Sequence, residues 1–266
     1  MPRFCANLSF LWPELEPLER FAAAARAGFE EVEYLFPQEL PAAGVAGALA
    51  DNGLRLVLFD AWPGDRDSGE RGCLAIPGRE AELRRSVDHA LELAARFGTR
   101  LINVLGGVLP EGLDRAAARG TAIANLLELA PRAGASGVTL LLENLNIHDA
   151  PGYVFPTVDA AADVVAAVDH GAVGLQFDFY HVCRAGQEPG ELFQRYAHLV
   201  RHVQLADTKG RHQPGTGGAP VEDFLRTLDS RGYNGGVGLE YHPLGSTEES
   251  LAWLAGWGRP GASARS

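Results

Sequence analysis

The chain has 266 residues, of which 46% are hydrophobic and 21% are charged. This is the composition of an ordinary globular protein, and the length suits one large domain, because a barrel of eight β/α units needs about 250 residues. Lys and Arg number 23 and Asp and Glu 34, so the net charge is −11. With no basic run to offset it, this charge argues against nucleic acid and anionic membranes as partners.

The sequence also argues against a membrane or secreted protein. No apolar run reaches the about 18 residues that a membrane span needs. Cys5, Cys73 and Cys183 lack a CxxC spacing, so we expect reduced thiols in a cytoplasmic protein. Asn7 and Ser9 interrupt the first apolar stretch, which predicts a strand rather than a signal peptide. The oligomeric state, a homo-oligomer included, is left open.

Short apolar runs alternate with helical patterns along the whole chain. The expected strands are Phe4–Phe10, Glu31–Leu35, Leu54–Phe59, Leu101–Leu105, Val138–Asn144, Val173–Asp178, His202–Ala206 and Val237–Tyr241. The expected helices are Leu15–Ala27, Arg79–Phe97, Ala116–Ala135, Val158–Val168 and Val221–Ser230. Three of these helices are expected to end at a glycine, namely Gly28, Gly98 or Gly232. Thr157 is expected to cap the helix Val158–Val168, and Pro131 to kink or break the helix Ala116–Ala135.

Eight β–α alternations without a linker predict a single-domain (β/α)₈ TIM barrel over residues 1–258, with a flexible tail over 259–266. An open doubly wound sheet is the alternative, but it typically carries a Gly-rich turn after the first strand. The segment Ser9–Glu14 (SFLWPE) has no such turn. The longest connection, Asp60–Gly78, follows the third strand on the face where barrel active sites lie. It is either a lid or a plain surface excursion.

Polar side chains stand at the carboxyl ends of the last four expected strands. They are Glu143, Asp178, Gln204 and Glu240. In a barrel these ends lie side by side on one rim, and buried carboxylates so close together repel unless a cation compensates them. Oxygen ligands suit a hard ion, so the four residues predict a site for Mg²⁺ or Mn²⁺. Gly236 and Gly238 share the face of Glu240 and suit a crowded interior.

Further polar residues follow the same strand ends. Lys209, Arg211 and His212 lie just beyond Gln204, and together with His181 they predict a clamp for a substrate carboxylate. Asn144 and Asn146 either bind substrate hydroxyl groups or hold their own loop. Asp207 and Glu33 are expected to support the metal ligands from behind. Each residue also has a simpler interpretation as an ordinary solvated or ion-paired side chain.

Several motifs around these residues resemble the hydroxypyruvate isomerase family. They are LLLENLN around Glu143, QFDFYH around Asp178, HVQLADTKGRHQPGTG around Gln204 and GVGLEYHP around Glu240. The opening RFCANLSFLWPE and the stretch VLFDAWPGDRDSGERGCLAIPGRE are also similar, so the resemblance extends from about Pro2 to Trp257. The wider group of sugar-isomerase-like barrels includes xylose isomerase, tagatose-type epimerases and endonuclease IV.

The resemblance implies that Glu143, Asp178, Gln204 and Glu240 bind the metal and that Glu143 and Glu240 transfer the proton. The expected reaction interconverts hydroxypyruvate and 2-hydroxy-3-oxopropanoate (tartronate semialdehyde) through an enediol, so the expected partner is a small anionic keto acid or sugar acid. The chain departs from the family where it has Asp60 instead of Asn, Gly218 instead of Glu, and Lys209 instead of a Pro-Gly step.

Four other functions stay open at this point. A 2-oxo-tetronate isomerase uses similar motifs on a longer substrate, and a related sugar or keto-acid epimerase usually has His in place of Gln204. A DNA-repair nuclease on the same barrel would need more histidine ligands and a basic face, which the net charge of −11 opposes. A non-enzymatic binding protein would have no need of the complete set of four strand-end ligands.

Overall fold

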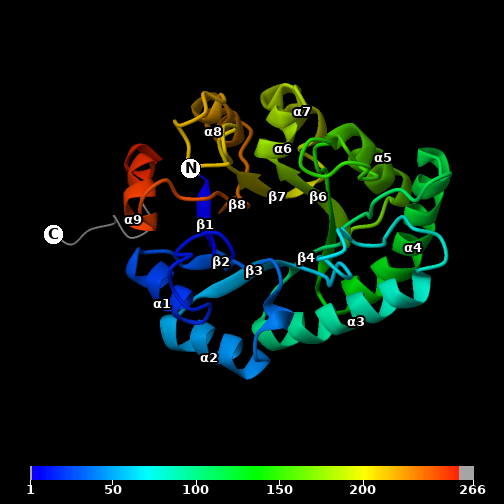
Figure 1. Ribbon diagram of the computed structural model, residues 1–266, viewed down its shortest axis with the longest axis horizontal. Coiled ribbons are helices and arrows are strands. Elements are labelled where there is room, and N and C mark those ends of the chain that lie inside the picture. The colour runs from blue at the N-terminus through cyan, green and yellow to red at the C-terminus, as the bar shows by residue number, and fades with distance from the viewer. Residues whose placement is uncertain (1, 258–266) are drawn as a thin grey trace.

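The barrel closes as the strand pattern predicts. The structure, a computed structural model, describes residues 2–257. In this part of the chain every strand pairs in parallel with the next one, and β8 closes the barrel against β1 (Figure 1). The strands are β1 Arg3–Asn7, β2 Glu31–Glu33, β3 Arg55–Asp60, β4 Leu101–Asn103, β5 Thr139–Glu143, β6 Val173–Asp178, β7 Val200–Leu205 and β8 Gly236–Leu239.

Helices form the outer ring of the barrel and bury their apolar faces against the strands (Figure 1). The α-helices are α1 Glu19–Arg26, α2 Ala42–Asn52, α3 Glu80–Phe97, α4 Arg115–Ala135, α5 Val158–Val168, α6 Phe179–Arg184, α7 Pro189–Tyr196, α8 Val221–Ser230 and α9 Thr247–Ser250. Two 3₁₀ turns, η1 Pro37–Glu39 and η2 Ala252–Trp257, complete the described elements. No helix within residues 2–257 is long and apolar enough to cross a membrane.

Several expected elements have different ends in the structure. β1 ends at Asn7 rather than Phe10, because the Phe10 N–H turns back to the Asn7 carbonyl (3.2 Å). β8 ends at Leu239 rather than Tyr241. β7 occupies Val200–Leu205 instead of the expected His202–Ala206, and α1 starts later than expected, at Glu19. The short helices α6 and α7 carry too few turns of periodic pattern to be expected from sequence, and α2, rich in Ala and Gly, has only Val45 and Leu49 as large apolar residues on its buried face. The tail expected over 259–266 lies outside the described residues.

The expected break in α4 is absent. The helix continues through Pro131 to Ala135, although proline donates no backbone hydrogen bond. Leu129, Ala130 and Ala133 on either side of it are fully buried, so packing against the core offsets the lost bond. The Thr157 cap is confirmed: its side chain accepts a hydrogen bond from the Ala160 N–H at the start of α5.

Aromatic packing sets which way β6 faces. Phe177 packs against Phe193 of α7 (ring centroids 5.7 Å apart) and against Phe224 of α8 (5.5 Å). Because successive residues of a strand point to opposite faces, this outward anchor turns Gln176 and Asp178 toward the barrel interior. The outer helices therefore determine the direction of a predicted metal ligand.

Glycines in β8 make room for polar groups inside the barrel. A Cβ at Gly238 would overlap the carboxylate of Glu33, and one at Gly236 would lie 2.7 Å from Cys5 Sγ. The expectation that these small residues suit a crowded interior is confirmed. Glu33 and His202, each with a side chain only 1% exposed, form a hydrogen bond in this space.

The connection from Asp60 to Gly78 forms part of the rim. Its second half is pinned to the end of β4, where Gly72 forms an isolated bridge with Gly106 and the Ala75 N–H donates to the Gly106 carbonyl (2.9 Å). Residues 73–76 are buried, whereas residues 65–69 are exposed. The segment is thus a wall with a packed base rather than a plain surface excursion.

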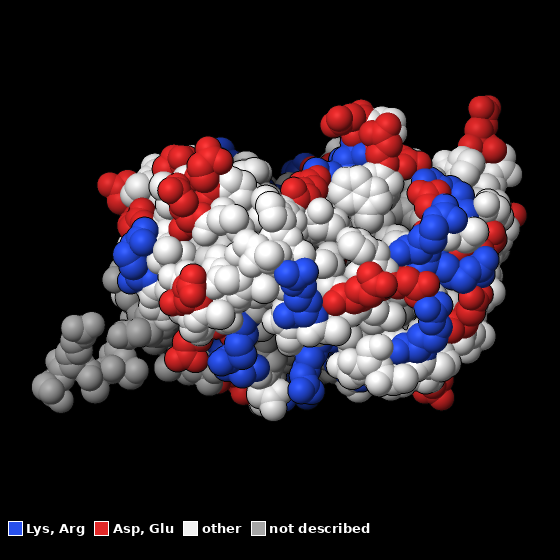
Figure 2. All heavy atoms as spheres, turned by 90° about the horizontal axis from the view of Figure 1, so that it is seen from below, with Lys and Arg blue, Asp and Glu red and all other residues white. Residues whose placement is uncertain are grey.

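Charges of both signs are interspersed on the face of the molecule that Figure 2 shows. Ion pairs join neighbouring elements here, as between Arg84 of α3 and Glu128 of α4 (3.1 Å). This face of the molecule carries no extended basic patch of the kind that binds a phosphate backbone.

Candidate active site

A pocket of about 300 Å³ opens at the carboxyl ends of the strands. Acidic groups from three of those ends, Asp60, Glu143 and Glu240, line it. Loops contribute the rest of the wall: Phe10, Leu35, Phe36, Pro63, Arg66, Glu70, Arg71, Leu105, Leu145, Asp149, Ala150, His181 and Arg211. Active sites of this fold lie at this face of the barrel.

Three buried side chains form a group that could hold a metal ion. One ligand atom from each of Glu143, Asp178 and His181 lies within 4.8 Å of the other two. β5 and β6 present the carboxylates at their ends, and the first turn of α6 presents the imidazole. Asp178 also caps α6 by accepting the His181 N–H (3.1 Å), so its carboxylate is fixed by the start of the helix that carries its neighbour.

The carboxylates repel one another in a buried setting. Burial, followed by the charges of Asp178 and Glu240, holds the pKa of Glu143 well above its usual range. Burial likewise raises the pKa of Glu240 well above its usual range, although Arg211 opposes the shift. The pKa of Asp178 is raised by burial against the same Arg211 charge. A divalent cation would stabilise the charged form of all three groups.

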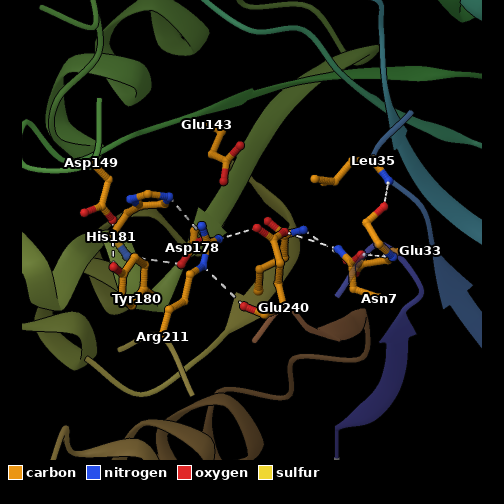
Figure 3. Close-up of polar contacts among 12 residues, drawn as sticks. Asn7, Glu33, Leu35, Glu143, Asp149, Asp178, Tyr180, His181, Arg211 and Glu240 are labelled. Carbon is orange, nitrogen blue, oxygen red and sulfur yellow. Dashed lines mark hydrogen bonds and ion pairs between the residues drawn. The ribbon is translucent and has the colours of Figure 1, made fainter. Parts of the chain in front are cut away.

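Arg211 supplies the positive charge that these carboxylates need in this structure. Its guanidinium lies between Asp178 Oδ2 (3.3 Å) and the Glu240 carboxylate, as Figure 3 shows. The ring of Tyr180 packs beneath it, with its centroid 4.7 Å from the guanidinium carbon. Burial lowers the pKa of Arg211, but Glu240 and Asp178 outweigh that effect, so its pKa is raised and it stays charged.

Gln204 lies next to Asp178 in the register of β6 and β7, but its amide is held inside the barrel. Its Nε2 donates to Glu33 Oε2 (3.0 Å), and its Oε1 accepts from Gln176 Nε2 (2.5 Å). Asn7 extends this network, because its Nδ2 donates both to Glu33 Oε2 (3.1 Å) and to Glu240 Oε2 (3.3 Å; Figure 3). Glu33 therefore lies behind two of the predicted ligands.

Other buried polar atoms near the pocket have no hydrogen-bond partner among the described residues. Both amide atoms of Asn144 are without one, as are Asp60 Oδ1 and Asn103 Oδ1. Asn103 Nδ2 donates to Glu143 Oε2 (2.8 Å), so one of these groups directly contacts a predicted catalytic residue. Buried polar atoms are nearly always satisfied, and a ligand or ordered water is the usual partner where the protein supplies none.

The predicted cationic clamp is only partly at the pocket. Arg211 and His181 line it. Lys209 is exposed, and His212 Nδ1 lies 2.7 Å from the His242 carbonyl oxygen; neither is among the residues that line the pocket. The loop instead wraps around Asp207, which accepts the N–H groups of Thr208, Gly215, Thr216 and Ala219. Asp207 thus shapes this loop.

Sequence reasoning missed several groups at or near the pocket, Glu70 and Asp149 among them. Asn7 and Asn103 bind the two predicted catalytic glutamates, and Arg66 and Arg71 enter the pocket from the loop after β3. The two asparagines carry the same signal as the predicted ligands, since each is a polar residue that ends an apolar strand, although the expected ligands all come from the last four strands. The arginines lie in a loop without periodic pattern, and no sequence signal marks them.

With this geometry, a family can be assigned by comparison. The family model described as "Xylose isomerase-like TIM barrel" matches residues 21–257. A structure described as an AP endonuclease, family 2, from Brucella melitensis superposes with a TM-score of 0.93 and 40% identity, covering 97% of this chain and 99% of that one. The chain belongs to the xylose isomerase-like TIM barrel family.

Curated relatives narrow this assignment. A 2-oxo-tetronate isomerase of Cupriavidus necator is 41% identical over 96% of this chain and 98% of its own length. The hydroxypyruvate isomerase of Escherichia coli is 35% identical over the same shares, 96% and 98%. Within the larger family the protein is therefore an isomerase of the group that contains these two enzymes, which confirms the resemblance seen in the sequence.

Proposed function

We propose that the protein interconverts a 2-oxo-3-hydroxy acid and its 2-hydroxy-3-oxo isomer, and that its substrate is a four-carbon acid of the 2-oxo-tetronate type. The observation that carries the proposal is the pair of buried glutamates, Glu143 and Glu240, which line one pocket from strands on different sides of it. The higher identity to a 2-oxo-tetronate isomerase supports the four-carbon acid over hydroxypyruvate, the substrate expected first from the sequence.

The reaction moves one proton between neighbouring carbons. One glutamate removes the proton from the carbon that bears the hydroxyl group, and a carboxylic acid returns a proton to the adjacent carbon, while the hydroxyl proton passes to the former carbonyl oxygen through the enediol. Burial raises the pKa values of Glu143 and Glu240, which favours holding the proton once it is taken. A bound cation would oppose that shift and keep the carboxylates ionised as bases.

The donor set fits a divalent cation. Glu143, Asp178 and Glu240 bring three carboxylates together, and Gln204 lies beside Asp178 in the strand register. When bound, Mg²⁺ or Mn²⁺ would polarise the substrate carbonyl and stabilise the charge that develops there.

His181 is suited to hydrogen bonding. Its Nδ1 accepts the Asn146 N–H (3.2 Å), so a neutral ring carries its proton on Nε2, which lies 3.7 Å from Asp178 Oδ2. Burial, followed by the charge of Arg211, lowers its pKa well below the usual range and keeps the ring neutral. A neutral ring with Nε2–H donates to a bound oxygen, whereas a metal would require that proton to be absent.

A substrate panel with added Mg²⁺ or Mn²⁺ tests the proposal. We expect the highest kcat/KM with 2-oxo-tetronate, a lower value with hydroxypyruvate, and none with DNA that contains an abasic site. Equal or faster turnover of hydroxypyruvate would overturn the four-carbon assignment. Cleavage of the DNA, the activity named for the Brucella relative, would overturn the reaction class; the net charge of −11 opposes it.

A further inference from the structure

Three arginines line the pocket, and two of them are already engaged. Arg211 pairs with Asp178 and Glu240. Arg66 pairs with Glu39, and its guanidinium carbon lies 4.4 Å from the centre of the Phe36 ring. A substrate carboxylate would have to compete with these partners for either group.

Arg71 is the third arginine, and no acid neutralises it. Its Nη1 makes one long polar contact, 3.5 Å from the carbonyl oxygen of Glu70, and its guanidinium makes no ion pair with any residue of 2–257. Glu70 itself is turned toward Arg79 (2.5 Å). A guanidinium that faces a pocket without a carboxylate partner can bind an anion through two parallel hydrogen bonds.

The backbone that presents Arg71 is fixed. The next residue, Gly72, bridges Gly106 beyond β4, and a Cβ on Gly72 would overlap the carbonyl group of Leu105. The Leu74 N–H donates to that same Leu105 carbonyl (3.3 Å), and the buried Asn125 of α4 donates to the Leu74 carbonyl (2.8 Å). A binding group on an anchored backbone loses little freedom when a ligand arrives.

Position in the barrel also favours Arg71. It belongs to the connection after β3, whereas Arg211 follows β7, on the opposite side of an eight-stranded ring. A carboxylate at Arg71 would therefore stay away from Asp178 and the other acids that Arg211 holds. Burial raises the pKa of Asp60, the acid at the end of β3, to about 8, so its neutral form does not cancel the charge of Arg71 near pH 7.

We propose that Arg71 binds the carboxylate group of the substrate and so selects 2-oxo acids over neutral ketoses. This inference rests on the proposed function for the identity of the substrate. It places the carboxylate end at the β3–β4 side of the pocket, which leaves the reacting carbons between Glu143 and Glu240.

Equilibrium binding tests the inference without turnover. The probes are erythronate, a four-carbon acid that lacks the reacting carbonyl, and erythritol, its uncharged counterpart, measured by calorimetry with saturating Mg²⁺. Arg71→Gln should weaken erythronate binding by about 10- to 100-fold, the range of a charge-assisted hydrogen-bond pair, and leave erythritol unchanged. Arg71→Lys should give an intermediate loss of erythronate affinity, because lysine keeps the positive charge but cannot form the two parallel hydrogen bonds of a guanidinium. Arg100→Gln, an exposed arginine just before β4 at the other end of the barrel, is the matched control.

Steady-state kinetics give a second measurement. Arg71→Gln should raise KM for 2-oxo-tetronate by the same factor with little change in kcat, and it should leave erythrulose, the neutral ketose of the same length, unaffected. Wild-type binding of erythronate by Arg71→Gln, or no erythronate binding by the wild type, would overturn the inference. If the wild type isomerises no acid yet binds erythronate through Arg71, the proposed function fails and the carboxylate site stands.

Discussion

At the scale of single residues, the groups that contact Glu143 and Glu240 differ from those that contact Asp178. Asn103 donates to Glu143 and Asn7 donates to Glu240, while Arg211 pairs with both Glu240 and Asp178. Only Asp178 also accepts two backbone N–H groups at the start of α6, so its carboxylate is fixed by the helix it caps. This difference predicts proton transfer at the two glutamates and binding at the aspartate.

Substituting the glutamates one at a time tests that division. Glu143→Gln and Glu240→Gln keep the shape and one ligand oxygen but cannot accept a proton. Each should retain much of its metal and lose kcat by about 10²- to 10⁴-fold, the usual worth of general acid–base catalysis. Metal content by elemental analysis and kcat are the two measurements. A metal-loaded double variant with wild-type turnover would contradict the mechanism.

Asp60 predicts a pH dependence of stability. Its pKa is about 8 in the folded protein, against about 3.9 in an unfolded chain, because it is buried. The folded state therefore holds a proton that the unfolded state lacks between these values. The stabilisation is complete at the acidic end and is lost as pH rises through about 8, by up to about 1.4 kcal/mol per pH unit.

The variant Asp60→Asn stays neutral and escapes this loss. Its free energy of unfolding relative to the wild type, measured by urea titration with chelator present, should therefore rise steadily from about pH 5 to about pH 8. Asp67→Asn, on the exposed part of the same loop, is the matched control. A trend of equal size in both variants would show that Asp60 is not its source.

At the scale of elements, one of the contacts that hold the segment after β3 is a close backbone approach at Gly72. Gly72 has a φ of 88° and no room for a Cβ beside the Leu105 carbonyl, whereas Gly69 has a φ of 87° and nothing within 4 Å. The two glycines share a backbone conformation that disfavours side chains, but only Gly72 is packed against β4. Comparing the two positions therefore separates the free-energy cost of a positive φ from the free-energy cost of the steric contact.

Alanine at each position measures the two costs. Gly69→Ala should lower the free energy of unfolding by about 1 kcal/mol, for the positive φ alone. Gly72→Ala should lose about 1–3 kcal/mol more, because the loop must shift away from Leu105. KM for the acid substrate should rise in Gly72→Ala only. Equal losses in both variants would mean that the contact at Leu105 does not hold the segment.

The elements that sequence predicts well are those with a long periodic pattern. α3 and α5 match the expected bounds closely, because amphipathic spacing continues over several turns and Gly98 and Thr157 mark their ends. The short α6 has no such pattern: it forms because Asp178 caps it and because Phe179 packs against Phe224 (ring centroids 4.9 Å apart). That packing depends on α8, which is remote in sequence.

At the scale of the whole molecule, the β/α alternation was sufficient to predict the barrel, and strand ends were sufficient to predict that Glu143 and Glu240 line one pocket with Asp178 beside Glu143. The side-chain partners could not be predicted in the same way. Nothing in a linear pattern shows that Gln204 turns toward Glu33, or that Arg71 crosses into the pocket, because both depend on distances across the closed ring.

The metal should bind the folded barrel but not the unfolded chain, because its predicted ligands come from strands that are far apart in the unfolded chain. Exhaustive chelation should abolish activity, and Mg²⁺ or Mn²⁺ should restore it. At a concentration about 100 times the Kd, the metal should add about 2.7 kcal/mol to the free energy of unfolding. Asp178→Asn should require more metal for both effects. Full turnover by metal-free protein would contradict this prediction.

The wall after β3 has a consequence for engineering. Its base is bonded to the segment just past β4, while residues 65–69 at its tip are exposed, and the two glutamates proposed to transfer the proton lie at the end of β5 and just past β8. A combinatorial library restricted to this tip would leave both glutamates in place. Selection on acids of different chain length could then exchange one substrate for another by altering a few loop residues, with the chemistry inherited unchanged from the opposite half of the ring.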